Sequence, residues 1–431
     1  MRALGVRQLT FAIINATVGA GIFVLPALVS QGLGAAAPLA FLVCAAMMAL
    51  IVTTLAIAGS RVTLTGGIYA YVEVAFGPFI GFLAGVLLWL TGLLAVSGVA
   101  SAFLDQAGVL APALQASGAR VAVIVVVFAT LAAVNARGVR SGVRVIEAVT
   151  AAKLIPLLIF VAVGLFFVNP EAVAWPGMPD TGELRRAVLL LIFAYSGAEI
   201  ALAPSGEVDH ATRTVPRALF LALAITTVLY IAIQLVAQGV LGADLSRFTL
   251  SPLAEAAGRF LGSAGRTLLL LGAVCSMFGY LCGDMLSSPR SLYAIARDGS
   301  LPSVLARIHP ERRTPHVAIW THAMLVIIVA STNSFQSLAI VSNVGLLLLY
   351  LLCCAAALEL ARRDVQAEGA PFAPRGAWLA PAAGAMLVVW ILSTATAAEF
   401  GVTAAVLAAA SVIFWAGLAV RRFRAAGRSR P

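Results

Sequence analysis

Charged residues are scarce in this chain, and lysine is almost missing. Only 11% of the 431 residues are charged, and Lys153 is the one lysine among 28 basic residues, the rest being arginine. With 61% hydrophobic residues and a mean hydropathy of +1.02, this scarcity excludes a soluble domain, because no soluble core needs that much apolar surface. The composition predicts an all-α polytopic membrane protein with short connections.

Cysteine and histidine are also few, and neither is grouped. The five cysteines fall inside predicted membrane helices, with no metal-ligand spacing and no pair in an outer loop, and the four histidines fall in predicted inner loops or at helix starts. The sequence has no nucleotide-binding loop and no nucleophile with a matching base. These absences predict a protein that is not an enzyme, holds no metal and needs no cofactor.

Twelve apolar stretches are long enough to cross a bilayer as helices, at roughly 20 residues each. They lie near residues 8–30, 37–60, 79–104, 119–135, 145–168, 184–205, 217–241, 264–297, 316–332, 336–360, 378–397 and 400–420. With both termini in the cytoplasm, 21 arginines lie on the inner side and six on the outer side, which are Arg120, Arg185, Arg186, Arg247, Arg259 and Arg266. The positive-inside rule favours this orientation, and so a multi-pass protein of the cell inner membrane. The net charge of +10 follows from this topology and from anionic lipid, and the dispersed arginines do not predict binding to nucleic acid.

Two of the predicted helices contain interruptions at mid-membrane. In the first, Gly19 and Gly21 bracket Ala20 and a proline follows at position 26. Each glycine costs about 1 kcal/mol relative to alanine in a helix, so we expect a break, although small residues alone also mark close helix packing. The sixth helix has a second irregular segment, Phe193-Ala-Tyr-Ser-Gly-Ala-Glu. Breaks in helices one and six, at corresponding places of two five-helix halves, indicate an inverted-repeat transporter with its site at the bilayer midplane.

The two breaks offer opposite charges to a ligand. The half-helix that starts after the first break presents free N–H groups, which suit a carboxylate. The half-helix that ends near Phe193 and Ala194 presents free carbonyls, which suit an ammonium group. A zwitterion fits between them, with Phe193 or Tyr195 either closing over it or serving only to pack the bundle. Glu199 lies one turn beyond the second break and is either a substrate-amine or proton site, or an acid hydrogen-bonded within the bundle.

Six motifs, in order, resemble those of the amino acid, polyamine and organocation transporter superfamily. They are Gly19-Ala-Gly-Ile-Phe, Gly66-Gly-Ile-Tyr-Ala-Tyr-Val-Glu-Val-Ala-Phe-Gly, Asn135-Ala-Arg-Gly-Val-Arg, Gly206-Glu-Val-Asp-His-Ala-Thr-Arg-Thr-Val-Pro-Arg-Ala, Ala296-Arg-Asp-Gly-Ser-Leu-Pro and His309-Pro-Glu-Arg-Arg-Thr-Pro-His. The resemblance covers nearly the whole chain and implies the fold first seen in bacterial leucine transporters (LeuT). Residues 1–360 are then a transport core of ten helices in a 5+5 inverted repeat, about 8–168 and 184–360. Residues 361–431 are two accessory helices and a basic cytoplasmic tail.

Within the superfamily, Phe193-Ala-Tyr-Ser-Gly is most similar to the L-type amino acid transporters and their bacterial relatives. This resemblance implies substrate contacts from the first break and from the second, with Phe193 as the occluding ring; the residues are Thr17, Gly19, Ala20, Gly21, Phe193, Ala194, Ser196 and Gly197. Glu199 stands where L-type members commonly carry asparagine, and it resembles the acid of some proton-sensitive exchangers. The charge of the substrate and a proton role for Glu199 therefore stay open.

Lys153 lies in an apolar run, where a charged side chain costs about 2.5 to 3.5 kcal/mol on insertion scales and therefore needs a partner. Snorkelling to the interface is the alternative. In several sodium-independent members of the superfamily a lysine at this place fills the space of a structural sodium ion between helices one, five and eight. The resemblance implies the same for Lys153, bonded to carbonyls released near Gly19.

Helix eight supplies a possible acidic partner for Lys153. Ser276, Tyr280, Asp284 and Ser287 recur at three- and four-residue spacing, which predicts one polar face toward the core. Asp284 is the predicted partner, or else a second contact for a substrate amine or an acid satisfied by neighbouring hydroxyls. If the two are paired the lysine stays charged, and if not it can exchange a proton during transport.

Together these features predict sodium-independent transport of amino acids by alternating access, with neutral amino acids as first choice and either exchange or proton symport as the mode. A cationic amino acid or polyamine carrier is the alternative, and a transporter-like sensor or channel is the rival from another class. The expected partners are a small-molecule substrate and the lipid bilayer, and the sequence leaves the oligomeric state open.

Overall fold

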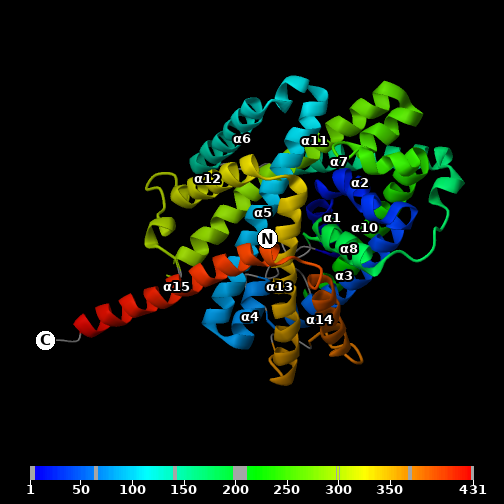
Figure 1. The fold of residues 1–431 in the computed structure, drawn as a ribbon. Helices are drawn as coiled ribbons and strands as arrows, with labels where there is room; N and C mark the ends of the chain where they lie inside the picture. Colours follow the sequence, from blue (N-terminus) through cyan, green and yellow to red (C-terminus); the bar gives the residue numbers. More distant parts are fainter. Residues whose placement is uncertain are drawn as a thin grey trace.

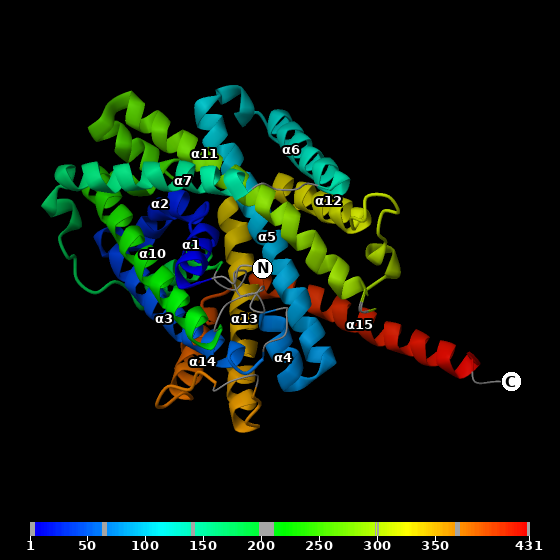
Figure 2. The same cartoon turned by 180° about the vertical axis from the view of Figure 1, so that it is seen from behind.

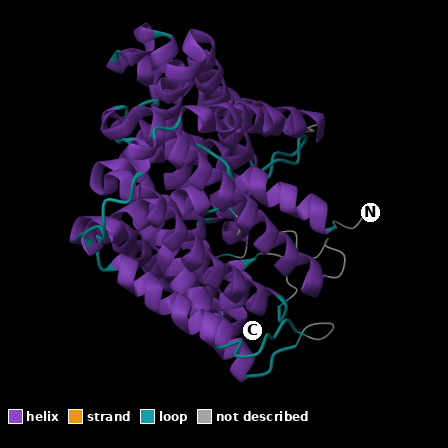
Figure 3. Cartoon of the chain, turned by 90° about the vertical axis from the view of Figure 1, so that its right-hand side faces the viewer, coloured by secondary structure: helices purple, strands orange, loops and turns teal. Residues whose placement is uncertain are grey.

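The computed structural model describes residues 5–62, 67–138, 143–197, 211–297, 299, 301–366 and 371–428. Within these ranges every regular element is a helix (Figure 3). The α-helices are α1 (Val6–Thr17), α2 (Gly21–Leu33), α3 (Ala37–Gly59), α4 (Ile68–Phe76), α5 (Pro78–Leu110), α6 (Ser117–Arg137), α7 (Val143–Gly164), α8 (Thr181–Tyr195), α10 (Ala211–Leu241), α11 (Pro252–Arg297), α12 (His316–Thr332), α13 (Phe335–Arg362), α14 (Leu379–Leu392) and α15 (Ala397–Arg428). Short 3-10 helices fill connections at Gly34–Ala36, Pro112–Gln115, Leu165–Phe167, Pro170–Val173, Gly242–Arg247 and Ser303–Ala306.

The predicted all-α polytopic membrane architecture is confirmed. Seven helices of the described chain are long and apolar enough to cross a membrane, and three shorter apolar helices accompany them, Lys153–Phe167, His316–Thr332 and Leu379–Leu392. Each predicted span overlaps a helix, and the stretch 316–332 coincides with α12. The sixth span is described only through α8 and the two residues after it.

The long helices cross within the bundle (Figures 1 and 2), and buried hydrophobic residues from most of them form one large core cluster. α5 packs along both α11 and α13, α10 packs along α1 and α3, and α8 packs against α2 and α3. α6 and α15 lie at the outside, and α15 extends away from the bundle (Figure 1). Only 17% of the most apolar stretch of α6 and 11% of that of α15 is buried in the protein, so their remaining apolar surface faces lipid.

Glycines at positive φ mark the ends of the short helix α4. Gly67 precedes it with φ 60° and Gly77 ends it with φ 87°, a region that favours glycine because it has no Cβ. Pro78 then starts α5, where its missing N–H is not needed. The glycine motif that follows predicted helix two thus separates α4 from the membrane helices on each side.

α11 is two helical segments joined at Gly262, whose φ of 65° and ψ of −157° are not helical. The second segment agrees with the predicted eighth span, which starts at residue 264. α11 as a whole packs against α5, α7 and α12, and Tyr280 of its second segment lies next to the break in the first helix.

Candidate functional site

The first membrane helix is broken where the glycines predict it. α1 ends at Thr17, residues 18–20 are not helical, and α2 starts at Gly21. Val18 still donates its N–H to the Ile14 carbonyl at 2.8 Å, which closes α1. The first turn of α2 has N–H groups with no carbonyl partner inside its own helix, and these are the groups expected to bind a carboxylate.

The second break follows α8. This helix runs from Thr181 to Tyr195, and its N-cap residue Asp180 accepts N–H bonds from Gly182 and Glu183 with its carboxylate. Ser196 is extended, with ψ 157°, and Gly197 has φ 124°, a conformation that side chains rarely adopt. The chain therefore leaves helical geometry at Ser196 and Gly197, as the irregular segment predicts.

The two breaks are in direct contact with each other. A Cβ atom added to Gly21 would lie 3.0 Å from the Cα and the Cβ of Ala194, and one added to Gly197 would lie 2.9 Å from the carbonyl carbon of Ala16. The start of α2 therefore rests on the end of α8, and the chain after α8 rests on the end of α1. No side chain larger than hydrogen fits at either glycine without displacing backbone.

Tyr230 of α10 joins the two breaks. Its hydroxyl lies 3.2 Å from the Thr17 carbonyl and 3.0 Å from the Ala194 carbonyl, so one O–H group serves an end of each broken helix. The side chain is fully buried, and its ring packs edge-on against Tyr195. Tyr230 is not among the site residues predicted from the sequence. Its signal is a tyrosine in the middle of an apolar span, because a buried phenol needs a hydrogen-bond partner.

The carbonyls at the end of α8 already accept hydrogen bonds from side chains. The Ser196 hydroxyl donates to the Phe193 carbonyl at 3.0 Å, as Tyr230 does to that of Ala194. The Phe193 ring is 8% exposed and meets Phe335 of α13 edge-on, with 5.2 Å between ring centroids. An ammonium group at this place would therefore share or displace these hydroxyl contacts.

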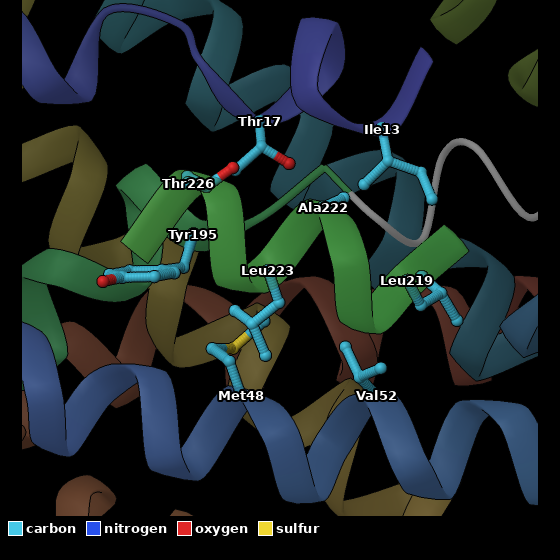
Figure 4. Close-up of a pocket in the computed structure, with 9 residues that line it drawn as sticks. All are labelled: Ile13, Thr17, Met48, Val52, Tyr195, Leu219, Ala222, Leu223 and Thr226. Atoms are coloured by element: carbon cyan, nitrogen blue, oxygen red, sulfur yellow. The ribbon is translucent and has the colours of Figure 1, made fainter. Parts of the chain in front are cut away.

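A small cavity lies beside the break in the first helix (Figure 4). Its lining includes Thr17 of α1, Met48 of α3, Tyr195 of α8 and Thr226 of α10, and its volume is about 10 Å³. This volume holds about one water molecule, so an amino acid needs the surrounding helices to separate. A larger hollow of about 360 Å³ lies at the start of α8, lined among others by Glu183 and Arg186, on the side that the predicted topology places outside.

Lys153 is 5% exposed, and its side chain reaches the first break rather than the membrane interface. Its Nζ donates to the main-chain carbonyl of Asn15 at 2.5 Å. That carbonyl would accept from the N–H of Gly19 if α1 continued, so the lysine takes the place of a missing helical partner. The ring of Tyr280 from α11 also lies beside the break, 3.8 Å from a Cβ added to Gly19.

Asp284 does not pair with Lys153. Its Oδ1 accepts a hydrogen bond from Ser288 at 2.5 Å, and its Oδ2 lies 2.8 Å from Nε2 of His322. Both carboxylate oxygens are thus engaged on the face of α11 that packs against α12 and α5. The prediction that every histidine lies in an inner loop or at a helix start is also wrong. His322 is the seventh residue of α12 and is 0% exposed.

The polar face of helix eight is only partly turned to the core. Ser276 is buried, and its hydroxyl has no hydrogen-bond partner within the described chain, while Ser287 is exposed and bonds to the Gly283 carbonyl of its own helix. The prediction of one core-facing stripe therefore holds from Ser276 to Asp284 and is wrong at Ser287. Glu199 and the motif from Gly206 to His210 lie outside the described residues.

Comparison with known proteins decides the family. The family model described as amino acid permease matches residues 4–420. The chain belongs to the amino acid permease family. The permease is 26% identical to a methylthioribose transporter of Bacillus subtilis, over 91% of this chain and 88% of that protein. It is 27% identical to the branched-chain amino acid permease BcaP of the same species, over 84% and 82% of the two chains, and 29% identical to its serine/threonine exchanger SteT, over 72% of each.

These matches confirm the resemblance to the amino acid, polyamine and organocation superfamily and the expectation that the chain is not an enzyme, because the family and these relatives are transporters. The permease is a multi-pass membrane protein. The relatives' names describe three different substrates, so membership in the family leaves the substrate to be argued from the site.

Proposed function

We propose that this permease carries neutral amino acids across the membrane by alternating access, without sodium. The contact between the two broken helices is the observation that carries the proposal. It brings the N-terminal end of α2 and the C-terminal end of α8 together, with Gly21 against Ala194. These ends carry partial charges of opposite sign, which match the carboxylate and the ammonium group of one amino acid.

The substrate groups would be held by main-chain atoms. The carboxylate would take the N–H groups of Gly19, Ala20 and Gly21, and the ammonium group the carbonyls near Thr17 and Ala194. Because main-chain groups read only the part common to all amino acids, the side chain would be selected elsewhere. Phe193 would close over the substrate from α8, where its ring already packs on Phe335.

Lys153 supports sodium independence. Its ammonium group donates to the Asn15 carbonyl, one of the oxygens that the break in the first helix releases. A fixed cation there supplies the charge that a bound sodium ion would bring. The engagement of Asp284 by Ser288 and His322 weighs against the cationic substrate alternative, because this acid is then not available to a second substrate charge.

Alternating access agrees with the sizes of the two spaces. The cavity beside Thr17 is too small for an amino acid, while the hollow beside Arg186 is about 360 Å³. The helices that meet at the breaks must therefore separate for a substrate to enter and to leave. The arginine distribution supports an inner-membrane location with both termini in the cytoplasm.

Uptake by purified permease in proteoliposomes tests the proposal. The substrates are labelled leucine, serine, arginine, putrescine and methylthioribose, each with and without sodium, with and without preloaded amino acid, and with and without a pH gradient. We expect uptake of leucine or serine that does not change when sodium is replaced by choline. Uptake of arginine, putrescine or methylthioribose without leucine or serine would overturn the proposed substrate, and a strict need for sodium would overturn the role of Lys153. Binding of a ligand without its accumulation or exchange would favour a sensor.

A further inference from the structure

Asp284 and His322 form a buried acid–base pair away from the broken helices. Nε2 of His322 lies 2.8 Å from Oδ2 of Asp284, and Ser288 holds the other carboxylate oxygen. The His322 side chain is 0% exposed and that of Asp284 is 6% exposed. The pair joins α11 to α12, and Gly92 of α5 lies beside it, since a Cβ added there would be 3.4 Å from the Ser288 hydroxyl. Ionisable side chains inside a membrane are costly and usually have a function.

A second observation concerns the other nitrogen of the histidine ring. The other ring nitrogen, Nδ1 of His322, is buried and has no hydrogen-bond partner within the described chain. The same holds for the indole nitrogen of Trp89 on α5, whose ring centroid is 6.3 Å from that of His322. Buried polar atoms are nearly always bonded, so an unpartnered ring nitrogen requires an explanation. A histidine that donates Nε2–H to the carboxylate has a lone pair at Nδ1, and that lone pair can bind a proton.

We propose that Asp284 and His322 are a proton-binding site of this permease, separate from its substrate site. The proton adds to Nδ1 of His322 and makes an imidazolium, and the Asp284 carboxylate neutralises it across the existing hydrogen bond. Release returns the neutral imidazole, so the pair changes its net charge by one without breaking the contact between α11 and α12. The proposal deepens the transport function proposed above and rests on it for the coupling of this proton to substrate.

Among the described residues, no hydrogen bond or ion pair joins another charged side chain to Asp284 or His322. α5 faces it with Trp89 and Gly92, which do not titrate. Asp105 of α5 pairs with Arg120 of α6, Glu255 of α11 pairs with Arg266, and Lys153 of α7 donates to the Asn15 carbonyl. Tyr230 of α10 bonds at the breaks, and the ring of His316 on α12 faces that of His309. The other described titratable or charged side chains on these elements are Arg137 at the end of α6, Arg213 and Arg217 at the start of α10, Arg259, Cys275, Tyr280 and Cys282 before Asp284 on α11, and Arg290, Tyr293 and Arg297 after it.

α11 connects this proton site to the substrate site. Tyr280 lies four residues before Asp284, about 6 Å along the helix at 1.5 Å per residue. Its ring lies against Gly19 in the first break. A change of charge at the pair can therefore alter the position of α11 at the break, which is the physical link that coupling needs.

The titration of His322 tests the site directly, without transport. Full-length permease labelled with 15N-histidine in nanodiscs is followed by NMR between about pH 5 and pH 9, and the signals absent from His322→Gln are assigned to His322. We expect one pair of ring signals that changes from the neutral to the charged form on acidification, and that Asp284→Asn alters this change because the carboxylate that neutralises the imidazolium is lost. A His322 that keeps one protonation form throughout overturns the proposal.

Transport tests the coupling separately. In proteoliposomes, we expect an inward proton gradient to stimulate leucine uptake by the wild type, and His322→Gln to lose this stimulation while its exchange at equal pH stays within about twofold of the wild type. His316→Gln, on the same helix, is the control and should behave as the wild type. Full stimulation in His322→Gln would overturn the coupling. A wild type that moves no neutral amino acid would overturn the proposed function, and the NMR titration would still decide the proton site.

Discussion

Nζ of Lys153 lies 2.5 Å from the carbonyl oxygen of Asn15, and this hydrogen bond fixes α7 to the last turn of α1. It occurs at the carbonyl that the break in the first membrane helix leaves without its helical N–H. The single lysine of the chain thus donates its hydrogen bond to a backbone carbonyl. That carbonyl lies a few residues from the glycines proposed to bind substrate.

Lys153→Ala is expected to reduce leucine uptake at least about tenfold while the protein still inserts. The substitution removes the hydrogen bond that the charged Nζ donates to the Asn15 carbonyl, and a hydrogen bond of this kind is worth about 1.5 to 3 kcal/mol. Uptake in proteoliposomes and the Tm of the purified protein check this. Ile155→Ala, at a 53% exposed position of the same helix, is the matched control. Wild-type rates with unchanged pH dependence in Lys153→Ala would remove the lysine from the mechanism.

Gly21→Val is expected to abolish substrate binding, and Gly21→Ala to weaken it. A Cβ at this position would lie 3.0 Å from both Cα and Cβ of Ala194, so the two broken helices must move apart. Binding of labelled leucine by scintillation proximity measures the effect. Gly118→Ala in α6 has open space around the added methyl group and should bind normally. Normal affinity in Gly21→Val would show that substrate does not bind at this contact.

Tyr230→Phe is expected to lower the stability by about 1 to 3 kcal/mol, because the Thr17 and Ala194 carbonyls lose their buried donor. The ring contacts with Phe41 and Tyr195 are kept, so the loss reports the hydroxyl alone. Thermal unfolding and the KM for leucine are the measurements. Tyr293→Phe, at a half-buried position near the end of α11, should change neither. An unaltered Tm in Tyr230→Phe would mean that neither carbonyl depends on it.

Phe193→Ala is expected to weaken leucine affinity about tenfold or more. Phe335→Ala is expected to weaken it less. The Phe193 ring packs edge-on against Phe335, and such a pair is worth about 0.5 to 1.5 kcal/mol beyond its buried area. Phe193→Leu should recover part of the affinity if the ring only covers the substrate. Equal affinity in Phe193→Ala and the wild type would assign the covering role to another residue.

The breaks and the helices could be predicted from the sequence because their signals are local. Gly19, Gly21 and Gly197 act on their own backbone, and apolar stretches define spans by length and composition. The partners of buried polar side chains could not be predicted in the same way. Asp284 and Tyr280 are only four residues apart on α11, yet one meets His322 and the other meets Gly19. The rotation of a helix about its axis decides such contacts, and a nearly uniform apolar sequence contains little information about it.

The position of the Tyr230 hydroxyl between two broken helices has a consequence for motion. A hydroxyl group has one hydrogen, so it cannot donate fully to both the Thr17 and the Ala194 carbonyl at once. When α1 moves away, the hydrogen can turn wholly to Ala194, and when the end of α8 moves away it can turn wholly to Thr17. The hydroxyl therefore keeps one hydrogen-bond acceptor whichever helix moves. At this point, opening toward one side has a similar energetic cost to opening toward the other.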